Sequence, residues 1–151
     1  MIEADAERTI VLLNGPNLNM LGRRQPEVYG KQTLADIEDA VRRAAAERGW
    51  NIVAVQSNHE GVLVDTIQEY GWSAFGIIIN PGAWTHYSIA IRDALAAVPA
   101  TVIEVHLSNV AAREAFRHTS VIAPIARGSV IGLGWRGYLL ALHWLMDELP
   151  A

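Results

Sequence analysis

Short runs of β-branched and other apolar residues alternate with longer amphipathic segments along the whole chain, and this alternation constrains the fold most. The apolar runs are residues 9–13, 51–56, 74–80, 100–106 and 130–133. Such continuous runs are typical of parallel strands buried on both faces. Helices are expected at residues 33–49, 62–70, 88–97, 109–116 and 138–149. The first of them has Thr33 as its N-cap and Asp36 in its first turn.

Strand and helix alternate five times, which predicts an α/β fold: a three-layer sandwich around a five-stranded parallel sheet in the flavodoxin-like order 2-1-3-4-5. The chain has 151 residues, which corresponds to a single domain over 1–151. A six-stranded dinucleotide fold needs a longer chain. Residues 1–8 are acidic and are expected to be disordered.

Composition excludes several classes of function. The net charge of −4 disfavours nucleic acid and anionic membrane surfaces as partners. The absence of cysteine excludes disulfides, thiolate metal sites and a cysteine nucleophile. No apolar run approaches the ~18 residues of a membrane span, and the first residues do not resemble an export signal. A cytoplasmic location is therefore expected.

Polar residues follow three strands that should be neighbours in the sheet. Asn14, Asn17 and Tyr29 follow the first, Asn80 and His86 the third, and Glu104, His106 and Ser108 end the fourth, with Arg113 and Arg117 beyond. Ligands of open parallel sheets bind at the carboxyl ends of the strands. These groups are therefore predicted to line one cleft for a small, polar, carboxylated ligand.

Structural roles are the alternatives. Asn14 and Asn17 would then cap turns, His86 would cap a helix, and Tyr29 would pack in its loop. Alternation places Glu104 and His106 on one face of a strand, where they could form a purely structural pair. His86, Glu104 and His106 could also imitate a two-histidine, one-carboxylate metal site, although no tight ligand spacing favours it.

Neither dinucleotide nor flavin binding is expected. Gly132, Gly134 and Gly137 fit the G-x-G-x-x-G pattern, but only 14 residues follow Gly137, too few for the acidic residue and its strand. These glycines are interpreted as close strand–helix packing. The loop after the first strand, residues 14–22, lacks the serine or threonine typical of a flavin phosphate loop.

Several motifs occur together in one order and spacing. They are LNGPNL at 13–18, GRRQPEVYG at 22–30, QSNHEG at 56–61, NPGAWTH at 80–86, EVHLSN at 104–109, AREAFR at 112–117, and GLG at 132–134 followed by YLLAL at 138–142. Together they resemble type II 3-dehydroquinate dehydratase over roughly residues 10–145.

The resemblance implies a catalytic domain that reversibly dehydrates 3-dehydroquinate to 3-dehydroshikimate, a step of the shikimate pathway of aromatic amino-acid and chorismate biosynthesis. It implies no cofactor, no metal and no Schiff base. It also implies a homo-oligomer, a dodecamer built as four trimers.

The resemblance also implies roles for individual residues. Tyr29 would remove the C2 proton, Arg24 would stabilise its anion, and Asn17 would hold a water against the enolate. His106, oriented by Glu104, would protonate the departing C1 hydroxyl. The substrate-binding groups would be Asn80, the Leu107 backbone N–H, Ser108, His86, Arg113, Arg117 and Asp93, the last from across a subunit interface.

The chain departs from the family pattern outside these positions. Gln25, Val62, Trp84, Tyr87 and Ala111 stand where other residues are usual, which affects expectations about the loop and the assembly. Two other functions stay open from the residues alone. They are a metal-dependent lyase or hydrolase using His86, Glu104 and His106, and a binding module without catalysis.

Overall fold

The computed structural model describes residues 7–23 and 25–149, apart from the side chains of Pro26 and Tyr29. Its centre is a five-stranded parallel sheet in the order β2-β1-β3-β4-β5, as the sequence predicts. The strands are β1 (Thr9–Asn14), β2 (Asn51–Gln56), β3 (Gly76–Asn80), β4 (Thr101–His106) and β5 (Gly128–Ile131). The α-helices are α2 (Pro26–Tyr29), α3 (Leu34–Ala46), α4 (Glu60–Tyr70), α5 (Ile89–Ala97) and α6 (Arg136–Glu148).

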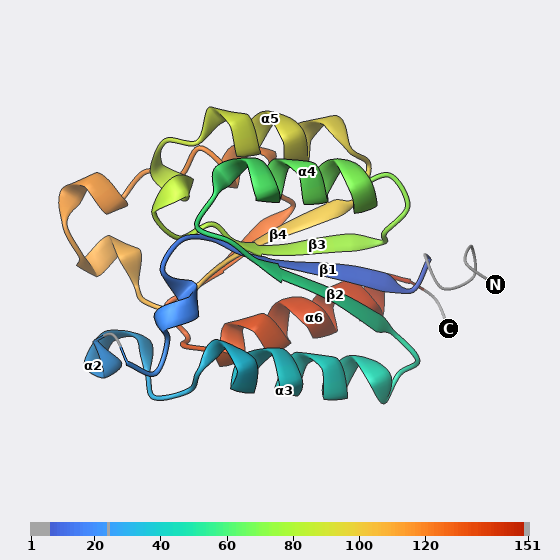
Figure 1. Cartoon of the computed structure of the whole chain (residues 1–151), viewed down its shortest axis with the longest axis horizontal. Coiled ribbons are helices and arrows are strands. Elements are labelled where there is room, and N and C mark those ends of the chain that lie inside the picture. Colours follow the sequence, from blue (N-terminus) through green and yellow to red (C-terminus); the bar gives the residue numbers. More distant parts are fainter. Residues whose placement is uncertain (1–6, 24, 150–151) are drawn as a thin grey trace.

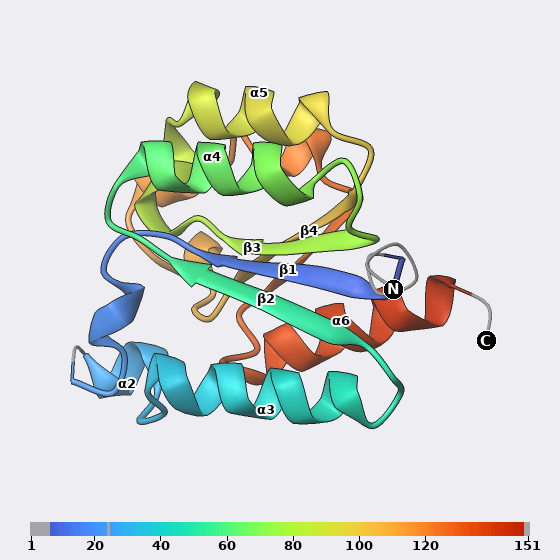
Figure 2. The same ribbon diagram turned by 45° about the vertical axis from the view of Figure 1, so that its right-hand side comes forward.

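Two helices cover each face of the sheet, so the molecule has three layers (Figures 1 and 2). The helices α3 and α6 pack on one face, against Ile10, Leu12 and Ile78. The helices α4 and α5 pack on the other face, against Val11, Leu13 and Ile77. Successive residues of one strand therefore enter opposite cores, which explains why the strands are apolar without alternation.

The helix that follows the first long loop begins at the predicted cap. Thr33 Oγ1 accepts a hydrogen bond from the Asp36 backbone N–H (3.1 Å), and the Asp36 carboxylate accepts one from the Thr33 N–H (3.1 Å). This reciprocal capping box satisfies two amides that the helix itself leaves unpaired. The predicted start of α3 is therefore confirmed.

The long loop between β1 and α3 contains two short helical elements that the sequence pattern did not indicate. A 3-10 turn, η1 (Leu18–Met20), follows β1, and α2 comes after it. Gly15 is the point where this loop crosses the end of β3. A Cβ atom there would lie 2.3 Å from the carbonyl oxygen of Pro81, so only glycine allows the two loops to approach this closely.

Two predicted elements are wrong in type or extent. The helix expected at 109–116 consists instead of two 3-10 turns, η3 (Val110–Ala112) and η4 (Ala115–Arg117), separated by Glu114 and an extended Arg113. Ala111 and Phe116 are exposed, so this segment lacks the buried face that stabilises a short helix.

The strand expected at 130–133 lies two residues earlier. Gly132 and Gly134 have φ angles of 86° and 66°, which a strand does not allow, and their N–H groups bond the carbonyls of His106 and Leu107. Gly137 does pack closely, since a Cβ atom there would lie 3.3 Å from Val130. The interpretation as strand–helix packing is therefore confirmed for Gly137, whereas Gly132 and Gly134 shape a turn.

None of the helices within residues 7–23 and 25–149 combines the length and apolar character that crossing a membrane requires.

Candidate active site

A pocket of about 290 Å³ opens where β1, β3 and β4 end. It is the place where the sequence predicts that polar groups converge. Eight of the twelve candidate residues line it: Asn17, Asn80, His86, His106, Leu107, Ser108, Arg113 and Arg117. The carboxyl ends of neighbouring parallel strands meet at one edge of the sheet, so residues far apart in sequence come together there.

An acid–histidine pair on β4 lies at the pocket, with His106 in its lining and Glu104 behind it. Glu104 is fully buried and His106 is 7% exposed, and their side chains lie on the same face of the strand. His106 Nε2 lies 2.5 Å from Glu104 Oε2. An ionised carboxylate only accepts hydrogen bonds, so Nε2 carries a hydrogen and Nδ1 is left for other partners. His106 also lines the pocket, so the pair can deliver a proton to a bound ligand.

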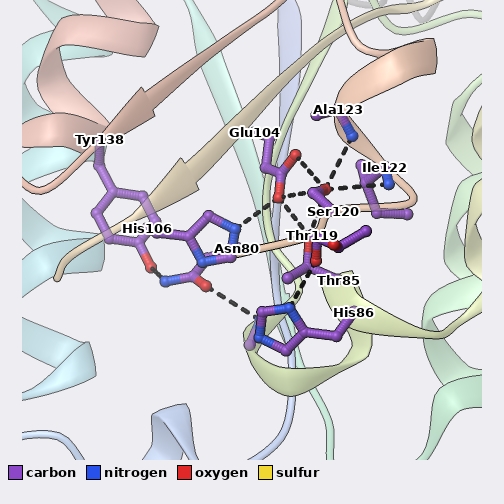
Figure 3. A network of polar contacts seen from close by, with 11 residues as sticks. Asn80, Thr85, His86, Glu104, His106, Thr119, Ser120, Ile122, Ala123 and Tyr138 are labelled. Atoms are coloured by element: carbon purple, nitrogen blue, oxygen red, sulfur yellow. Dashed lines mark hydrogen bonds and ion pairs between the residues drawn. The ribbon is translucent and has the colours of Figure 1, made fainter. Parts of the chain in front are cut away.

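The Glu104 carboxylate is surrounded by donors from outside its own strand (Figure 3). Thr85 Oγ1 donates to Oε2, and Ser120 Oγ lies 2.9 and 3.0 Å from Oε1 and Oε2. Burial alone would raise the pKa of Glu104. The hydrogen bonds from His106, Thr85 and Ser120 and the charge of His106 outweigh it and hold the pKa of that carboxyl below its ordinary value. Glu104 is therefore ionised at neutral pH.

His86 lies on the 3-10 turn η2 (Gly82–His86), and its ring is fixed by the main chain. Its Nδ1 donates to the carbonyl oxygen of Thr119 at 2.8 Å, because a carbonyl only accepts. The alternative that His86 caps the next helix is wrong. Ser88 caps α5, with its hydroxyl oxygen accepting from the Ile91 N–H at 3.1 Å. His86 is therefore held with its other nitrogen available to the pocket that it lines.

Asn80 is oriented by a buried chain of hydrogen bonds. The Gly82 N–H donates to Asn80 Oδ1 (3.1 Å), Asn80 Nδ2 donates to the Tyr138 hydroxyl (2.9 Å), and that hydroxyl donates to Asn14 Oδ1 (2.6 Å). Because a backbone N–H only donates, it fixes the direction of every bond in the chain. One amide hydrogen of Asn80 is thereby used on Tyr138, and the second is left for the pocket. Asn14 is thus part of this network and does not act as a turn cap.

Tyr138 is fully buried, and burial raises the pKa of its phenol above the ordinary value, so it stays protonated as the chain of bonds requires. Tyr138→Phe is expected to lower the free energy of unfolding by about 2–3 kcal/mol, because it leaves a buried Asn14 oxygen and an Asn80 N–H without partners. Denaturant unfolding of both proteins measures this. Tyr87→Phe, a matched change on a residue that is 63% exposed, should stay within about 0.5 kcal/mol. Equal stabilities of the two variants would contradict the network.

Cationic and hydroxyl groups also line the pocket. Arg113 Nη1 donates to Ser108 Oγ at 3.2 Å, and Arg117 Nε donates to Glu114 Oε2 at 3.1 Å. Both arginines come from the loop after β4, which the turns η3 and η4 shape. A guanidinium bonded to a serine hydroxyl, with a second guanidinium in the lining of the same pocket, suits a ligand that carries a carboxylate.

Asn17 enters the pocket from the β1 side. It precedes η1 in the left-handed conformation, with φ 70°, and its side chain forms no capping bond there, so the turn-cap alternative is wrong. Its N–H donates to Asn58 Oδ1 at 2.9 Å, which ties this loop to the end of β2. The strained backbone and the anchor together aim Asn17 at the pocket that it lines.

Two candidate residues that the structure describes, Glu104 and Asp93, are not among the pocket-lining groups. Glu104 lies behind His106, fully buried. Asp93 lies on α5 with its side chain 69% exposed, next to Arg92. Arg24 and the side chain of Tyr29 lie outside the described part of the structure. The helix α2, to which Tyr29 belongs, lies at the end of the molecule where the strands end (Figures 1 and 2).

The side chains of the alternative metal site, His86, Glu104 and His106, are engaged in other hydrogen bonds. No group of three or more histidine, aspartate or glutamate side chains in the described residues is arranged to hold a metal ion. Both oxygens of Glu104 accept from hydroxyls, and Nε2 of His106 faces the same carboxylate. This donor set fits a proton-transfer pair and not a two-histidine, one-carboxylate site.

Sequence reasoning missed three residues that shape the site: Thr119, Ser120 and Tyr138. Serine and threonine near a pocket are too common to be singled out from a sequence. Tyr138 stood in a recognised motif, but its contact with Asn14 spans 124 residues and follows only from the path of α6.

Comparison with known proteins gives one consistent result. Residues 8–146 match the family model described as dehydroquinase class II. The chain is 63% identical to a protein of Roseiflexus castenholzii over 91% of this chain and 87% of that protein, and 52% identical to one of Bacillus subtilis over 91% and 93%. Both relatives are named 3-dehydroquinate dehydratase.

Solved structures of similar fold point to the same family. The type II dehydroquinase of Propionibacterium acnes superposes with a TM-score of 0.90 at 43% identity, covering 93% of this chain and 97% of that one. A 3-dehydroquinate dehydratase-like protein of Bifidobacterium longum gives a TM-score of 0.70 at 28% identity, covering 95% and 98%. The sequence match spans nearly the whole chain, and the solved structures share its fold, so the chain belongs to the class II dehydroquinase family.

Proposed function

We propose that this protein reversibly dehydrates 3-dehydroquinate to 3-dehydroshikimate, a step of the shikimate pathway. The observation that carries the proposal is the buried Glu104–His106 pair, whose histidine lines the same pocket as His86, Arg113 and Arg117. The names of the relatives point to the same reaction. The pocket offers what the reaction needs: a proton donor for a departing hydroxyl and cations for a carboxylate.

His106 is the proposed general acid. Loss of the C1 hydroxyl is slow unless that oxygen receives a proton as its bond to carbon breaks. The ionised Glu104 accepts the hydrogen of Nε2, and Nδ1 is the ring nitrogen not used on the carboxylate. The proton therefore passes from Nδ1 to the leaving hydroxyl, which departs as water.

Tyr29 is the proposed base, with Arg24 as its partner. The C2 proton lies next to a ketone, so its removal gives an enolate. A free tyrosine has a pKa of about 10, so work near pH 7 needs about 4 kcal/mol of preferential stabilisation of the anion. A nearby guanidinium supplies that by charge and hydrogen bonding. The motif at 22–30 and the place of α2 at the pocket end of the molecule support these roles.

Asn17 is proposed to hold a water against the developing enolate oxygen. Asn80, the Leu107 N–H and Ser108 are proposed to bind the substrate carboxylate, with Arg113 nearby, and His86 and Arg117 to contact ring hydroxyls. All of them line the pocket, and the orientations of Asn80 and His86 are fixed by Tyr138 and Thr119. Preorganised donors of this kind stabilise charge that develops during the reaction.

The proposed reaction needs neither a cofactor nor a Schiff base. Lys31 is the single lysine in the sequence, and it is not among the residues that line the pocket. The loop that carries Arg24 and Tyr29 is proposed to close over the substrate and expel water, with hinges at Gly22 and Gly30. Both glycines have φ angles of 89°, which other residues adopt only under strain.

We further propose a homododecamer in which Asp93 reaches the site of a neighbouring subunit. The exposed carboxylate on α5, outside the lining of its own pocket, is consistent with that role. Light scattering on the purified protein should give a mass near twelve times 16.5 kDa. A fully active monomer would refute both the assembly and the role of Asp93.

Turnover of 3-dehydroquinate tests the proposed function. The product is a conjugated enone, so its formation is followed by ultraviolet absorbance. We expect turnover that survives a metal chelator and treatment with borohydride, which traps Schiff bases. Loss of activity on chelation, restored by a divalent ion, would favour a metal-dependent lyase. Substrate binding without any turnover would favour a binding module.

A further inference from the structure

Three consecutive residues connect the surroundings of the two pocket histidines. We call them the 119–121 segment: Thr119, Ser120 and Val121, between η4 and η5 (Ala123–Ile125). The Thr119 carbonyl accepts from His86, Ser120 donates to Glu104, and the Val121 N–H donates to the Thr85 carbonyl at 2.7 Å. Figure 3 shows that this segment lies beside both Glu104 and His86.

The Ser120 hydroxyl is held so that its hydrogen is directed to the carboxylate and to the Thr85 hydroxyl that itself donates to the carboxylate. Its oxygen accepts from the backbone N–H groups of Ile122 (3.1 Å) and Ala123 (2.9 Å). With these acceptor positions used, the O–H is left to donate. The acceptors within reach are the two Glu104 oxygens, 2.9 and 3.0 Å away, and Thr85 Oγ1 at 2.7 Å, whose own hydrogen goes to Glu104. Backbone donors that polarise a hydroxyl strengthen the bond that the hydroxyl makes onward.

Thr85 approaches the same carboxylate from the other direction. Its hydroxyl donates to Glu104 Oε2, the oxygen that also faces His106, and its side chain is almost fully buried. The Val121 N–H bond to the Thr85 carbonyl ties this residue to the 119–121 segment. Movement of the segment would therefore disturb both hydroxyl donors and the His86 ring together.

We propose that the 119–121 segment is a positioning element for both pocket histidines, in which Ser120, with Thr85, holds Glu104 ionised and aligned so that His106 acts as a proton donor. The catalytic consequence rests on the proposed function, since it assumes that His106 protonates the leaving hydroxyl. Ser120 and Thr85 act through Glu104 and are positioning residues.

The groups around Glu104 determine how strongly its protonation depends on the hydroxyl donors. Its register neighbours are Ile79 on β3 and Ser129 on β5, and the groups that donate to it from η2 and from the 119–121 segment are hydroxyls. His106 on the same strand is the titratable group that contacts it. Loss of one hydroxyl donor therefore raises the pKa of the Glu104 carboxyl.

Ser120→Ala tests the proposal with two readouts. The first is infrared difference spectroscopy of the protonated Glu104 carboxyl, identified by its absence in Glu104→Gln. The carboxylate loses a donor, so we expect it to take up a proton at a pH about one unit higher than in the wild type. The second is the pH profile of kcat. Its acid limb should move to higher pH, kcat should fall about tenfold, and KM should change by less than about threefold.

Two further variants sharpen the test. Ser120→Thr keeps the hydroxyl and should restore most of kcat, whereas Ser73→Ala removes an exposed hydroxyl outside the pocket and should leave both readouts unchanged. If Ser120→Ala fails to fold, Thr85→Val removes the other hydroxyl that donates to Glu104 while nearly keeping the side-chain shape. It should likewise raise the pH at which Glu104 takes up a proton, move the acid limb to higher pH and lower kcat.

The outcomes separate the two proposals. An unchanged protonation pH together with an unchanged acid limb in Ser120→Ala or Thr85→Val overturns the positioning role. A higher KM at constant kcat also overturns it, because it would indicate a binding role. The infrared readout needs no turnover. A wild-type protein that does not convert 3-dehydroquinate while Ser120→Ala still shifts Glu104 protonation contradicts the proposed function and supports the positioning of the pair.

Discussion

His106→Ala is expected to lower kcat for 3-dehydroquinate by about 10²- to 10⁴-fold, the range typical of a lost general acid. The C1 hydroxyl is a poor leaving group without a proton, whereas the groups proposed to bind the carboxylate are untouched. KM should therefore stay within a few-fold of the wild type. Steady-state kinetics on the purified variant, followed by enone absorbance, measures both constants.

A matched histidine provides the control. His143 lies on α6 outside the pocket lining, with its Nδ1 bonded to the Leu139 carbonyl, and His143→Ala should retain kcat within about twofold. If His106→Ala also keeps kcat within a few-fold of the wild type, the Glu104–His106 pair is structural. The short contact between the two side chains would then serve only to satisfy a buried carboxylate.

The second large effect is expected at the loop that carries the proposed base. Tyr29→Phe removes one oxygen and should lower kcat by at least ~100-fold, because no group then removes the C2 proton. Arg24→Ala should give a similar loss by another route. The phenol stays, but its pKa rises and charge stabilisation of the transition state is lost. Arg24→Lys should restore only part of the rate, because a point charge does not replace the planar guanidinium.

The double variant tests whether the two residues serve one step. If both act in the same proton transfer, the loss in Tyr29→Phe/Arg24→Ala should be far smaller than the product of the single losses. Full multiplicativity would contradict the shared role, and so would near-normal kcat in Tyr29→Phe. Tyr87→Phe, the same chemical change on an exposed tyrosine outside the pocket lining, should have no effect.

The features that the sequence predicted well are those set by local periodicity. Continuous apolar strands required helices on both faces, and the helices α3, α4, α5 and α6 supply them. Alternation along β4 put Glu104 and His106 on one face, and the order of the strands brought Asn80 and His86 to the same edge. Thr33 is the N-cap that the sequence predicted, because capping depends on neighbours in sequence, and its capping box with Asp36 goes beyond that prediction.

The features that were missed depend on the path of loops and on distant contacts. Ser120 reaches Glu104 across 16 residues, and Tyr138 reaches Asn14 across 124, so no local pattern marks either contact. The segment expected as a helix at 109–116 has helix-forming residues but no core to pack against, and packing stabilises short helices more than propensity does. The end of β5 was misplaced because Gly132 and Gly134 turn the chain.

The central claim is that two groups catalyse two separate steps. The proposed base on the loop removes the C2 proton to form the enolate, and the Glu104–His106 pair then protonates the departing hydroxyl. Exchange of the C2 hydrogen of 3-dehydroquinate with deuterated solvent, followed by NMR, tests it most directly. His106→Ala should still exchange this hydrogen while forming almost no enone, whereas Tyr29→Phe should do neither. Loss of exchange in His106→Ala, or exchange retained in Tyr29→Phe, would contradict the account.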